Sequence, residues 1–400
     1  MTRRTGVLAV AAAVAALTCA AAPQQATVIV LSWDGTRFDA LERAALPGLE
    51  RLEREGVRAK ALVPPFPSNT FPSHVTLATG THPDRHGIVG NEFLDPERGE
   101  FDYDNDASWI EAEPLWVAAE RQGVPTATFF WVGSETPWHG VAATHRKTPF
   151  SSKVSESEKV AQILTWLDLP GPKRPRLILS WWHGADRQGH RRGADHRDVT
   201  RALEQQDTEL VRLLAGIDAR GLWPSTTLIV VSDHGMVTTE RARDPEGALD
   251  DAGLEARVIA GGGMASVYLE APTDLEAARK ALAHLPGVTV FARDELPAHL
   301  RARHPRMGDL ILLTSPPAQF APLGLRRLGL GARGTHGFDP SVHEEMHGVF
   351  LAMGLGVAPG SRLPRLHAID LAPTVAALLG IDPPARSEGQ ARLPVRGAQP

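Results

Sequence analysis

The sequence predicts an α/β fold, a three-layer α/β/α sandwich with a mostly parallel central sheet. Short apolar runs rich in β-branched residues recur along the chain, and helix-like segments separate them. Acidic residues stand at the ends of several of these runs. Ligands bind beyond the carboxyl ends of the strands in such sheets, so this placement indicates one site on one rim of the sheet.

Four apolar runs are predicted to be buried strands, because each is short and bounded by turn residues. They cover residues 27–33, 124–131, 177–182 and 226–232. The clearest helix is predicted over about 195–217, where one apolar stripe contains Val199, Leu203, Leu210, Leu213, Leu214 and Ile217. A last helix is predicted over 369–379.

A smaller α/β pattern interrupts the main one at about residues 263–314. Strands are expected near 265–269, 288–291 and 309–313, with a helix near 275–285. We interpret this segment as a small insertion in one large domain over 27–385, which a C-terminal tail over 386–400 follows. The segment 316–333 is rich in Gly, Pro, Leu and Arg, which predicts a surface loop.

Residues 1–22 are predicted to be a secretory signal peptide, with Arg3-Arg4 before an apolar run over 7–17 and small residues up to Ala22. That run is short for a membrane span, and no other stretch approaches the ~20 apolar residues that one needs. We therefore expect a soluble mature protein without a transmembrane segment, in the periplasm or secreted. The only cysteine, Cys19, lies in this segment, and lipid attachment there is the alternative to an incidental residue; Thr18 fits the lipoprotein pattern poorly.

Composition excludes some classes of function. The net charge of −5 argues against a general nucleic-acid-binding protein, which would present a basic face. With its only cysteine in the predicted signal, the mature protein has no disulfide and no thiolate ligand. Any metal site must therefore use His and carboxylate ligands.

The residues that carry chemistry are Asp and His side chains near strand ends and in glycine-rich turns. Alone, each has an ordinary explanation as a helix cap or a polar surface turn. Together they form a set of six candidate ligands for two divalent metal ions: Asp34, Asp186, His190, Asp233, His234 and His336.

Thr70 and Asn91 offer groups that a phosphate ester would need. Thr70 is predicted at or just before the N-terminus of a helix that begins near Pro72. An N-cap role is the plain alternative for this threonine. The functional alternative is a nucleophilic hydroxyl next to helix amides that hold a phosphate. Asn91 could donate to a phosphoryl oxygen, or could simply stabilise a turn.

These residues lie in motifs that resemble the nucleotide pyrophosphatase/phosphodiesterase family of the alkaline phosphatase superfamily. The resemblance runs from Ile29 to about Pro383. It rests on five motifs in order: VLSWDG, FPSNTFPSHVTLATGTHPDRHGIVGN, DRQGH, VSDHGM and GTHGFDP. The resemblance implies an alkaline-phosphatase-like fold and a compact, bacterial type of catalytic domain.

The resemblance also implies two Zn²⁺ ions and a role for each matching residue. One ion would be held by Asp34, Thr70, Asp233 and His234, and the other by Asp186, His190 and His336. Thr70 would attack phosphorus and form a covalent phosphothreonine, while Asn91 would hold a non-bridging oxygen. Three carboxylates and a Thr70 alkoxide would balance the charge of the two ions, and mixed His and carboxylate ligands favour zinc over magnesium.

The chain departs from the family before Asp186, where Trp181-Trp182-His183-Gly184-Ala185 replaces the usual pattern. Phe71 and Phe150 could sandwich a nucleobase, with ordinary packing as the alternative. The expected function is a two-zinc hydrolase of phosphodiester or pyrophosphate bonds in small nucleotides.

Other functions on the same fold remain alternatives. A phosphomonoesterase, a phosphonoacetate-type hydrolase or a lipid-headgroup phosphodiesterase would use similar metals. A monoesterase needs an additional cation near the phosphate, for which Arg37, Arg85 and Arg187 lie near motifs. A non-catalytic metal- or phosphate-binding relative would be expected to lack a ligand or the nucleophile, and this chain lacks neither.

Overall fold

The computed structural model describes residues 25–321 and 333–393, so the predicted signal peptide and Cys19 lie outside the described residues. Its main feature is an eight-stranded sheet in the order β19-β2-β18-β9-β1-β8-β6-β7. The strands are β1 Thr27–Trp33, β2 Val57–Ala59, β6 Thr126–Phe129, β7 His145–Lys147, β8 Leu177–Trp182, β9 Thr226–Val231, β18 Phe350–Gly354 and β19 Ser361–Leu363. Only β18 runs against the others, being antiparallel to β9 and β2, so the sheet is mostly parallel as predicted.

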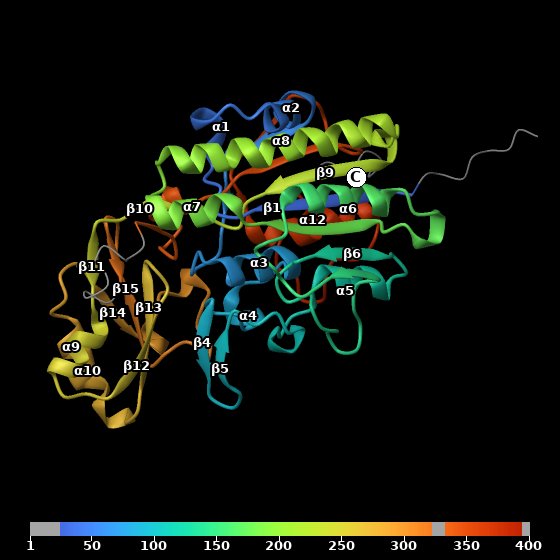
Figure 1. The fold of residues 1–400 in the computed structure, drawn as a ribbon. Helices are drawn as coiled ribbons and strands as arrows, with labels where there is room; N and C mark the ends of the chain where they lie inside the picture. Colours follow the sequence, from blue (N-terminus) through green and yellow to red (C-terminus); the bar gives the residue numbers. More distant parts are fainter. Residues whose placement is uncertain (1–24, 322–332, 394–400) are drawn as a thin grey trace, which may run out of the picture.

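Helices cover both faces of this sheet (Figure 1). Side chains of β1 alternate between the two faces, with Ile29 and Leu31 in one core and Val28 and Val30 in the other. The first core also contains residues of α2 (Pro47–Glu55), α6 (Glu156–Leu167) and α8 (Arg197–Ala219). The second contains residues of α3 (Thr70–Thr79), α5 (Leu115–Arg121) and α12 (Leu371–Leu379). The predicted three-layer sandwich is therefore confirmed.

Short elements connect these layers. The remaining helices of the main body are α1 Ala40–Arg43, α4 Pro83–His86 and α7 Gly184–Arg192. Two-stranded pairs join β3 (Leu62–Val63) to β20 (Leu366–His367), β4 (Glu92–Asp95) to β5 (Gly99–Asp102) and β10 (Val237–Thr238) to β17 (Gly334–Thr335). The last pair brings the chain after Asp233 next to the chain before His336, which matters for the site below.

A second, four-stranded sheet stands beyond one end of the main sheet, at the left of Figure 1. Its order is β12-β13-β15-β14, with bounds β12 Ala256–Ala260, β13 Met264–Leu269, β14 Thr289–Ala292 and β15 Leu310–Leu313. Helices α9 (Pro245–Asp251) and α10 (Leu275–Leu282) contribute Leu249, Ala278 and Leu282 to its core. The small unit thus begins before residue 256, earlier than the predicted start near 263, because β12 was not predicted.

The predicted surface loop over 316–333 is wrong in its first part. Ala318–Phe320 forms the buried strand β16, which pairs in parallel with β11 (Arg241–Arg243). Residues 322–332 of that prediction lie outside the described residues. The C-terminal packing also continues past the predicted boundary at 385, since Leu393 is buried in the second core. Within the described ranges, no helix is long and apolar enough to cross a membrane.

Candidate active site

The predicted metal ligands meet at the carboxyl ends of three neighbouring strands of the main sheet. Asp34 follows β1 directly, Asp233 follows β9 after one residue, and Asp186 lies in the first turn of α7 just beyond β8. Since β1 pairs with both β8 and β9, the three carboxylates lie on one rim. The structure thus brings these three predicted ligands together at one edge of the sheet.

A glycine makes the first of these turns possible. Gly35 follows Asp34 with φ +65°, a left-handed conformation that residues with a side chain rarely adopt. A Cβ atom at this position would also lie 2.9 Å from the Cα and Cβ atoms of Asp186. The β1 turn therefore approaches α7 closely enough to bring Asp34 near Asp186 only because residue 35 has no side chain.

Distances between charged atoms define two neighbouring groups. The Nε2 atom of His234 lies 3.4 Å from Asp34 Oδ1 and 3.3 Å from Asp233 Oδ2. The Oδ1 atom of Asp186 lies 3.4 Å from His190 Nε2 and 3.8 Å from His336 Nε2. Ligand atoms of Asp186, His190 and His336 lie within 4.8 Å of one another, as do those of Asp34, Asp186 and His234. Asp186 therefore belongs to both groups and links them.

All three imidazoles are held in the same way. Each donates a hydrogen bond from Nδ1 to a backbone carbonyl: His190 to Gly334 at 3.0 Å, His234 to Gly235 at 2.8 Å and His336 to Ser68 at 3.0 Å. Such a bond fixes the tautomer that leaves Nε2 as an acceptor. The Nε2 atoms of His190 and His336 then face each other at 3.1 Å. Two acceptors at this distance require a cation or a proton between them.

One oxygen atom of each carboxylate also lacks a hydrogen-bond partner among the described residues, on the side that faces the imidazoles. Asp34 Oδ1, Asp186 Oδ1 and Asp233 Oδ2 are buried without a hydrogen-bond partner among the described residues. Buried carboxylate oxygens are normally satisfied, and leaving one unpaired costs stability. The donor set of carboxylates and imidazoles fits the binding of divalent transition-metal ions.

Electrostatics in the cluster are strong. Burial raises the pKa of Asp34 well above its usual value, and the charges of Asp233 and Asp186 raise it further. Burial acts in the same direction on Asp233, but the imidazoles of His234 and His74 outweigh it and lower the pKa of Asp233 to about 2. Burial, then His234 and His190, lowers the pKa of His336 well below its usual value. Neutral His336 is the form that can bind a metal.

Thr70 lies beside this cluster as the first residue of α3, as predicted. Its Oγ1 atom is 3.2 Å from His234 Nε2. The N-cap position belongs to Asn69 instead, and neither residue caps the helix with its side chain. His74, one turn along, has Nδ1 2.9 Å from the Thr70 carbonyl and 3.3 Å from Asp233 Oδ2. The Thr70 hydroxyl therefore faces the candidate metal ligands and does not serve as a cap.

Asn91 reaches the same helix terminus from the chain before β4. Its Oδ1 accepts a hydrogen bond from the Phe71 amide at 2.9 Å, and its Nδ2 donates to the hydroxyl of Tyr103 at 3.3 Å. The first bond orients the Asn91 amide and ties it to Phe71, the residue that follows Thr70 in the sequence. This is the arrangement expected of a donor to a phosphoryl oxygen.

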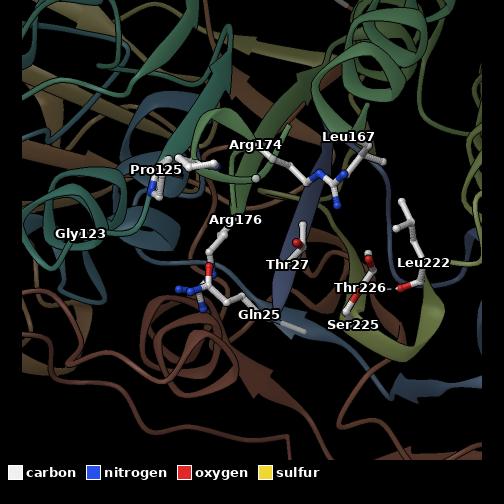
Figure 2. A pocket seen from close by; sticks show the side chains of 12 residues that line it. Gln25, Thr27, Gly123, Pro125, Leu167, Arg174, Arg176, Leu222, Ser225 and Thr226 are labelled. Carbon is white, nitrogen blue, oxygen red and sulfur yellow. Dashed lines mark hydrogen bonds between the residues drawn. The ribbon is translucent and has the colours of Figure 1, made fainter. Parts of the chain in front are cut away.

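A cavity of about 300 Å³ opens onto this cluster between the main body and the small sheet. From the main body it is lined by Asn69, Asn91, Tyr103, His190 and His336, and from the small unit by Ile259–Gly262, Met264 and Ser266. A larger cavity of about 530 Å³ lies elsewhere (Figure 2). That one is lined by Thr27, Arg176 and Thr226 at the amino ends of the strands, so it lies at the opposite edge of the sheet.

The two predicted base-binding phenylalanines do not line the smaller cavity. Phe71 is only 2% exposed, and its ring packs edge-on against Phe101 and Tyr103. Phe150 is stacked on Trp181, with 4.7 Å between ring centroids. The two rings belong to separate aromatic groups, and the structure does not place them as a pair at this cavity.

Tyr103 and Asn69 line the cavity but were not among the residues predicted for the site. Tyr103 is 51% exposed and has φ +45°. Asn69 Oδ1 accepts from His336 Nδ1 at 3.1 Å. Both had a signal in the sequence: Asn69 directly precedes Thr70, and Tyr103 is one of only two tyrosines, in a polar Asp-Tyr-Asp stretch.

Comparisons with known proteins agree with this geometry. Residues 28–339 match the type I phosphodiesterase / nucleotide pyrophosphatase family. A Schizosaccharomyces pombe protein named as an uncharacterised pyrophosphatase/phosphodiesterase is 38% identical over 226 residues, which are 55% of this chain and 46% of that protein. The mouse bis(5'-adenosyl)-triphosphatase enpp4 is 28% identical over 364 residues, 89% of this chain and 78% of that protein.

Solved structures of relatives have the same fold. Human ectonucleotide pyrophosphatase/phosphodiesterase 5 superposes with a TM-score of 0.84 at 26% identity, covering 91% of this chain and 97% of that one. An inactive threonine-to-alanine variant of the murine protein, in complex with AMP, gives 0.82 at 25% identity, covering 90% and 96%. With its family match over most of its length, this chain belongs to the type I phosphodiesterase / nucleotide pyrophosphatase family of hydrolases.

Proposed function

We propose that this protein is a two-zinc hydrolase that cleaves phosphodiester or pyrophosphate bonds of small nucleotides through a covalent phosphothreonine intermediate. One observation carries the proposal. The Thr70 hydroxyl lies 3.2 Å from His234 Nε2, at the start of a helix, beside three carboxylates and three imidazoles whose free atoms face one another.

The roles of the chain's own residues follow from their positions. Thr70 Oγ1 would attack phosphorus while the Asn91 NH₂ group, held at the start of α3, donates to a non-bridging oxygen. The bond from phosphorus to the leaving oxygen breaks as the bond to Thr70 forms, and water later releases the phosphoryl group from Thr70. His74, bonded to the Thr70 carbonyl, would keep this residue in place.

Metal ions complete the site. We propose that Asp34, Thr70, Asp233 and His234 hold one ion and that Asp186, His190 and His336 hold the other. When bound, the two ions would supply Lewis acidity that lowers the pKa of the Thr70 hydroxyl and offsets charge on the leaving oxygen. The linking position of Asp186 between the two groups of ligand atoms supports a pair of ions over a single one.

The cavity favours a diester over a monoester. A phosphomonoester carries one more negative charge, which calls for an additional Lys or Arg near the phosphate. Among described residues, no Lys or Arg lines the cavity, whereas Glu92 does. Arg37 is paired with Asp39 and Asp195, and Arg85 and Arg187 are exposed on the surface. Of the described residues, the cavity thus offers no cation for the additional charge of a monoester.

Nucleotides are the proposed substrates because of the relatives. The mouse relative enpp4 is named as a bis(5'-adenosyl)-triphosphatase, and the murine phosphodiesterase 5 variant was solved in complex with AMP. By analogy, we propose that this chain releases a nucleoside monophosphate. The N-terminal sequence pattern supports a periplasmic or secreted location, where it would act on extracytoplasmic nucleotides.

Substitution of Thr70 tests the proposed function. With bis(p-nitrophenyl) phosphate and zinc, Thr70→Ala should lower kcat by at least about a thousandfold, because it removes the attacking oxygen. Zinc content should fall by no more than one ion per chain. Thr70→Ser keeps a hydroxyl and should retain measurable turnover.

A substitution outside the cluster serves as the control. Thr76→Ala, in the same helix, removes a hydroxyl bonded to His86 and should leave the rate nearly unchanged. A Thr70→Ala protein with wild-type activity, or a wild-type protein without stoichiometric metal that is fully active, would contradict the proposal. The rate with p-nitrophenyl phosphate, measured in parallel, should be much lower than with the diester.

A further inference from the structure

Tyr103 combines three features that the proposed reaction does not yet use. It follows β5 in a left-handed backbone conformation, with φ +45°, which is uncommon for a residue other than glycine. It is 51% exposed, although it is a large aromatic residue. It also lines the same cavity as Asn91, His190 and His336. Unusual backbone geometry and exposure at a cavity call for a functional explanation.

Two hydrogen bonds tie Tyr103 to Asn91. The Tyr103 amide donates to the Asn91 carbonyl at 3.0 Å, and Asn91 Nδ2 donates to the Tyr103 phenol oxygen at 3.3 Å. The Phe71 amide fixes Asn91 Oδ1 from the other side at 2.9 Å. The Asn91 side chain is thus held at both ends, with one of its two N–H groups directed at Tyr103 and the other left for a ligand.

The Tyr103 hydroxyl can still donate one hydrogen bond. Its oxygen accepts from Asn91, and its own O–H has no acceptor among the residues that the structure describes. Partial desolvation raises the pKa of Tyr103; the hydrogen bond from Asn91 opposes this shift, and the charges of Glu92, Asp186 and Asp34 add to it. The phenol therefore remains a donor at neutral and mildly alkaline pH. Asn91 Nδ2 and the Tyr103 phenol oxygen are 3.3 Å apart, so an N–H of the first and the O–H of the second can both donate to one acceptor oxygen.

We propose that the Tyr103 hydroxyl is a second donor to the phosphoryl oxygen that Asn91 holds, and that it orients the Asn91 amide for this task. This inference rests on the proposed function, because it needs a phosphoryl group beside Thr70. It makes Tyr103 a residue of the phosphate-binding site, distinct from the aromatic packing that its ring provides against Phe71.

The expected kinetic effect depends on the stage of the reaction at which the phosphoryl oxygen gains negative charge. A donor aimed at a phosphoryl oxygen is worth most when that oxygen gains charge, in the transition state. Loss of the hydroxyl should therefore lower kcat and leave KM nearly unchanged. A residue that only contacts the nucleoside through its ring would change KM instead.

The chain offers a matched pair of variants, since Tyr103 and Tyr268 are its only tyrosines. Tyr268 donates to the Arg306 carbonyl at 2.8 Å within the small unit and does not line the cavity. Tyr103→Phe should reduce kcat for bis(p-nitrophenyl) phosphate about 10- to 100-fold, with KM within about threefold of wild type. Tyr268→Phe should leave both values near wild type.

A stereochemical readout separates a direct contact from a structural effect. Each diastereomer of the p-nitrophenyl phosphorothioate diester of thymidine places sulfur, a poor acceptor, at a different non-bridging position. The wild type should prefer one diastereomer, and Tyr103→Phe should reduce this preference, because it removes a donor at one position only. Tyr268→Phe should keep the wild-type ratio.

Failure of this inference can be told from failure of the proposed function. If Tyr103→Phe keeps the wild-type kcat, or loses activity without a change in the diastereomer ratio, the phenol is not a phosphoryl donor and the inference is overturned. Wild-type turnover that depends on Thr70 would still support the proposed function in that case. If wild type shows no metal-dependent turnover at all, the proposed function fails first.

Discussion

Single side chains around the candidate ligands determine how the ligands are oriented. The indole N–H of Trp181 donates to Asp34 Oδ2 at 2.9 Å, which leaves Oδ1 of that carboxylate directed toward His234. Trp181 also packs edge-on against His74 and stacks on Phe150. This tryptophan lies in the run before Asp186 where the chain departs from the family pattern. In this chain, that run therefore supplies a donor to a candidate ligand.

Replacement of Trp181 tests this role. Trp181→Phe keeps an aromatic ring but removes the donor to Asp34, so we expect zinc affinity to fall about 10- to 100-fold. Competition with a zinc-binding dye measures this. Trp182→Phe is the control, because the Trp182 indole donates to Ser180 and contacts no candidate ligand. Equal zinc affinities for wild type and Trp181→Phe would show that the indole does not support the site.

Helix α6 shows how an element next to the site is attached. A capping box between Ser155 and Glu158 starts the helix, and its apolar side enters the first core. Lys159 is completely buried in this contact, where its ammonium group donates to the Trp181 carbonyl at 2.8 Å. It forms an ion pair with Glu156 at 3.8 Å, and the charges of Asp34 and Glu158 act on it from further away. A buried charge of this kind is costly, so the contact must be sensitive to pH.

The expected pH effect has a definite sign. Burial lowers the pKa of Lys159 to about 8, whereas an unfolded lysine has a pKa of about 10.4. Between these values the unfolded chain binds more protons, so Lys159 makes the folded state more stable as pH rises. The unfolding free energy of wild type minus that of Lys159→Met should therefore become more positive above pH 8, by up to about 1.4 kcal/mol per pH unit.

Urea unfolding at several values between pH 7 and 9.5 gives this difference. Other titrating groups cancel because both proteins contain them. Lys153→Met, at an exposed position before α6, should give no such slope. If the difference between wild type and Lys159→Met stays constant over this range, Lys159 titrates normally in the folded protein.

In the whole molecule, the site is assembled from segments far apart in the chain. Asp34, Asp186 and Asp233 come from three strand ends, while His336 follows the small unit and β17. Without metal, the folded protein confines three carboxylates within a buried space. Because the pKa of Asp34 is raised, its ionisation favours the unfolded state at neutral pH, and this penalty grows as pH rises above the unfolded value. Metal binding should therefore stabilise the whole fold.

Removal of metal tests this coupling. We expect EDTA to lower the Tm of wild type clearly at pH 7.5. Asp34→Asn should show a smaller EDTA-dependent change, because it removes both a ligand and the buried repulsion, and without metal it should be more stable than wild type. Asp207→Asn is the control: Asp207 is also buried with a raised pKa, but it accepts from the Gly48 and Leu49 amides away from the site. Its EDTA effect should match that of wild type.

Much of the fold could be predicted from particular residues. The strand over 177–182 and the long amphipathic helix were placed within about two residues, because their patterns are local. The buried strand β16 was not predicted, since it depends on pairing with β11, which lies far back in the chain. Strand β12 was also not predicted, although its partner β13 follows it directly.

By itself, the sequence determined which chemical groups are present and which rim of the sheet they share, because local patterns identify strand ends and turn glycines. The tertiary structure decided how those groups are oriented. It directed Nε2 of three imidazoles inward through backbone carbonyls, placed Asp186 between the two groups of ligands, and exposed Tyr103 while it enclosed Phe71. The bonds of His190 and His336 join residues more than a hundred positions apart, and only the folded chain brings them within hydrogen-bonding distance.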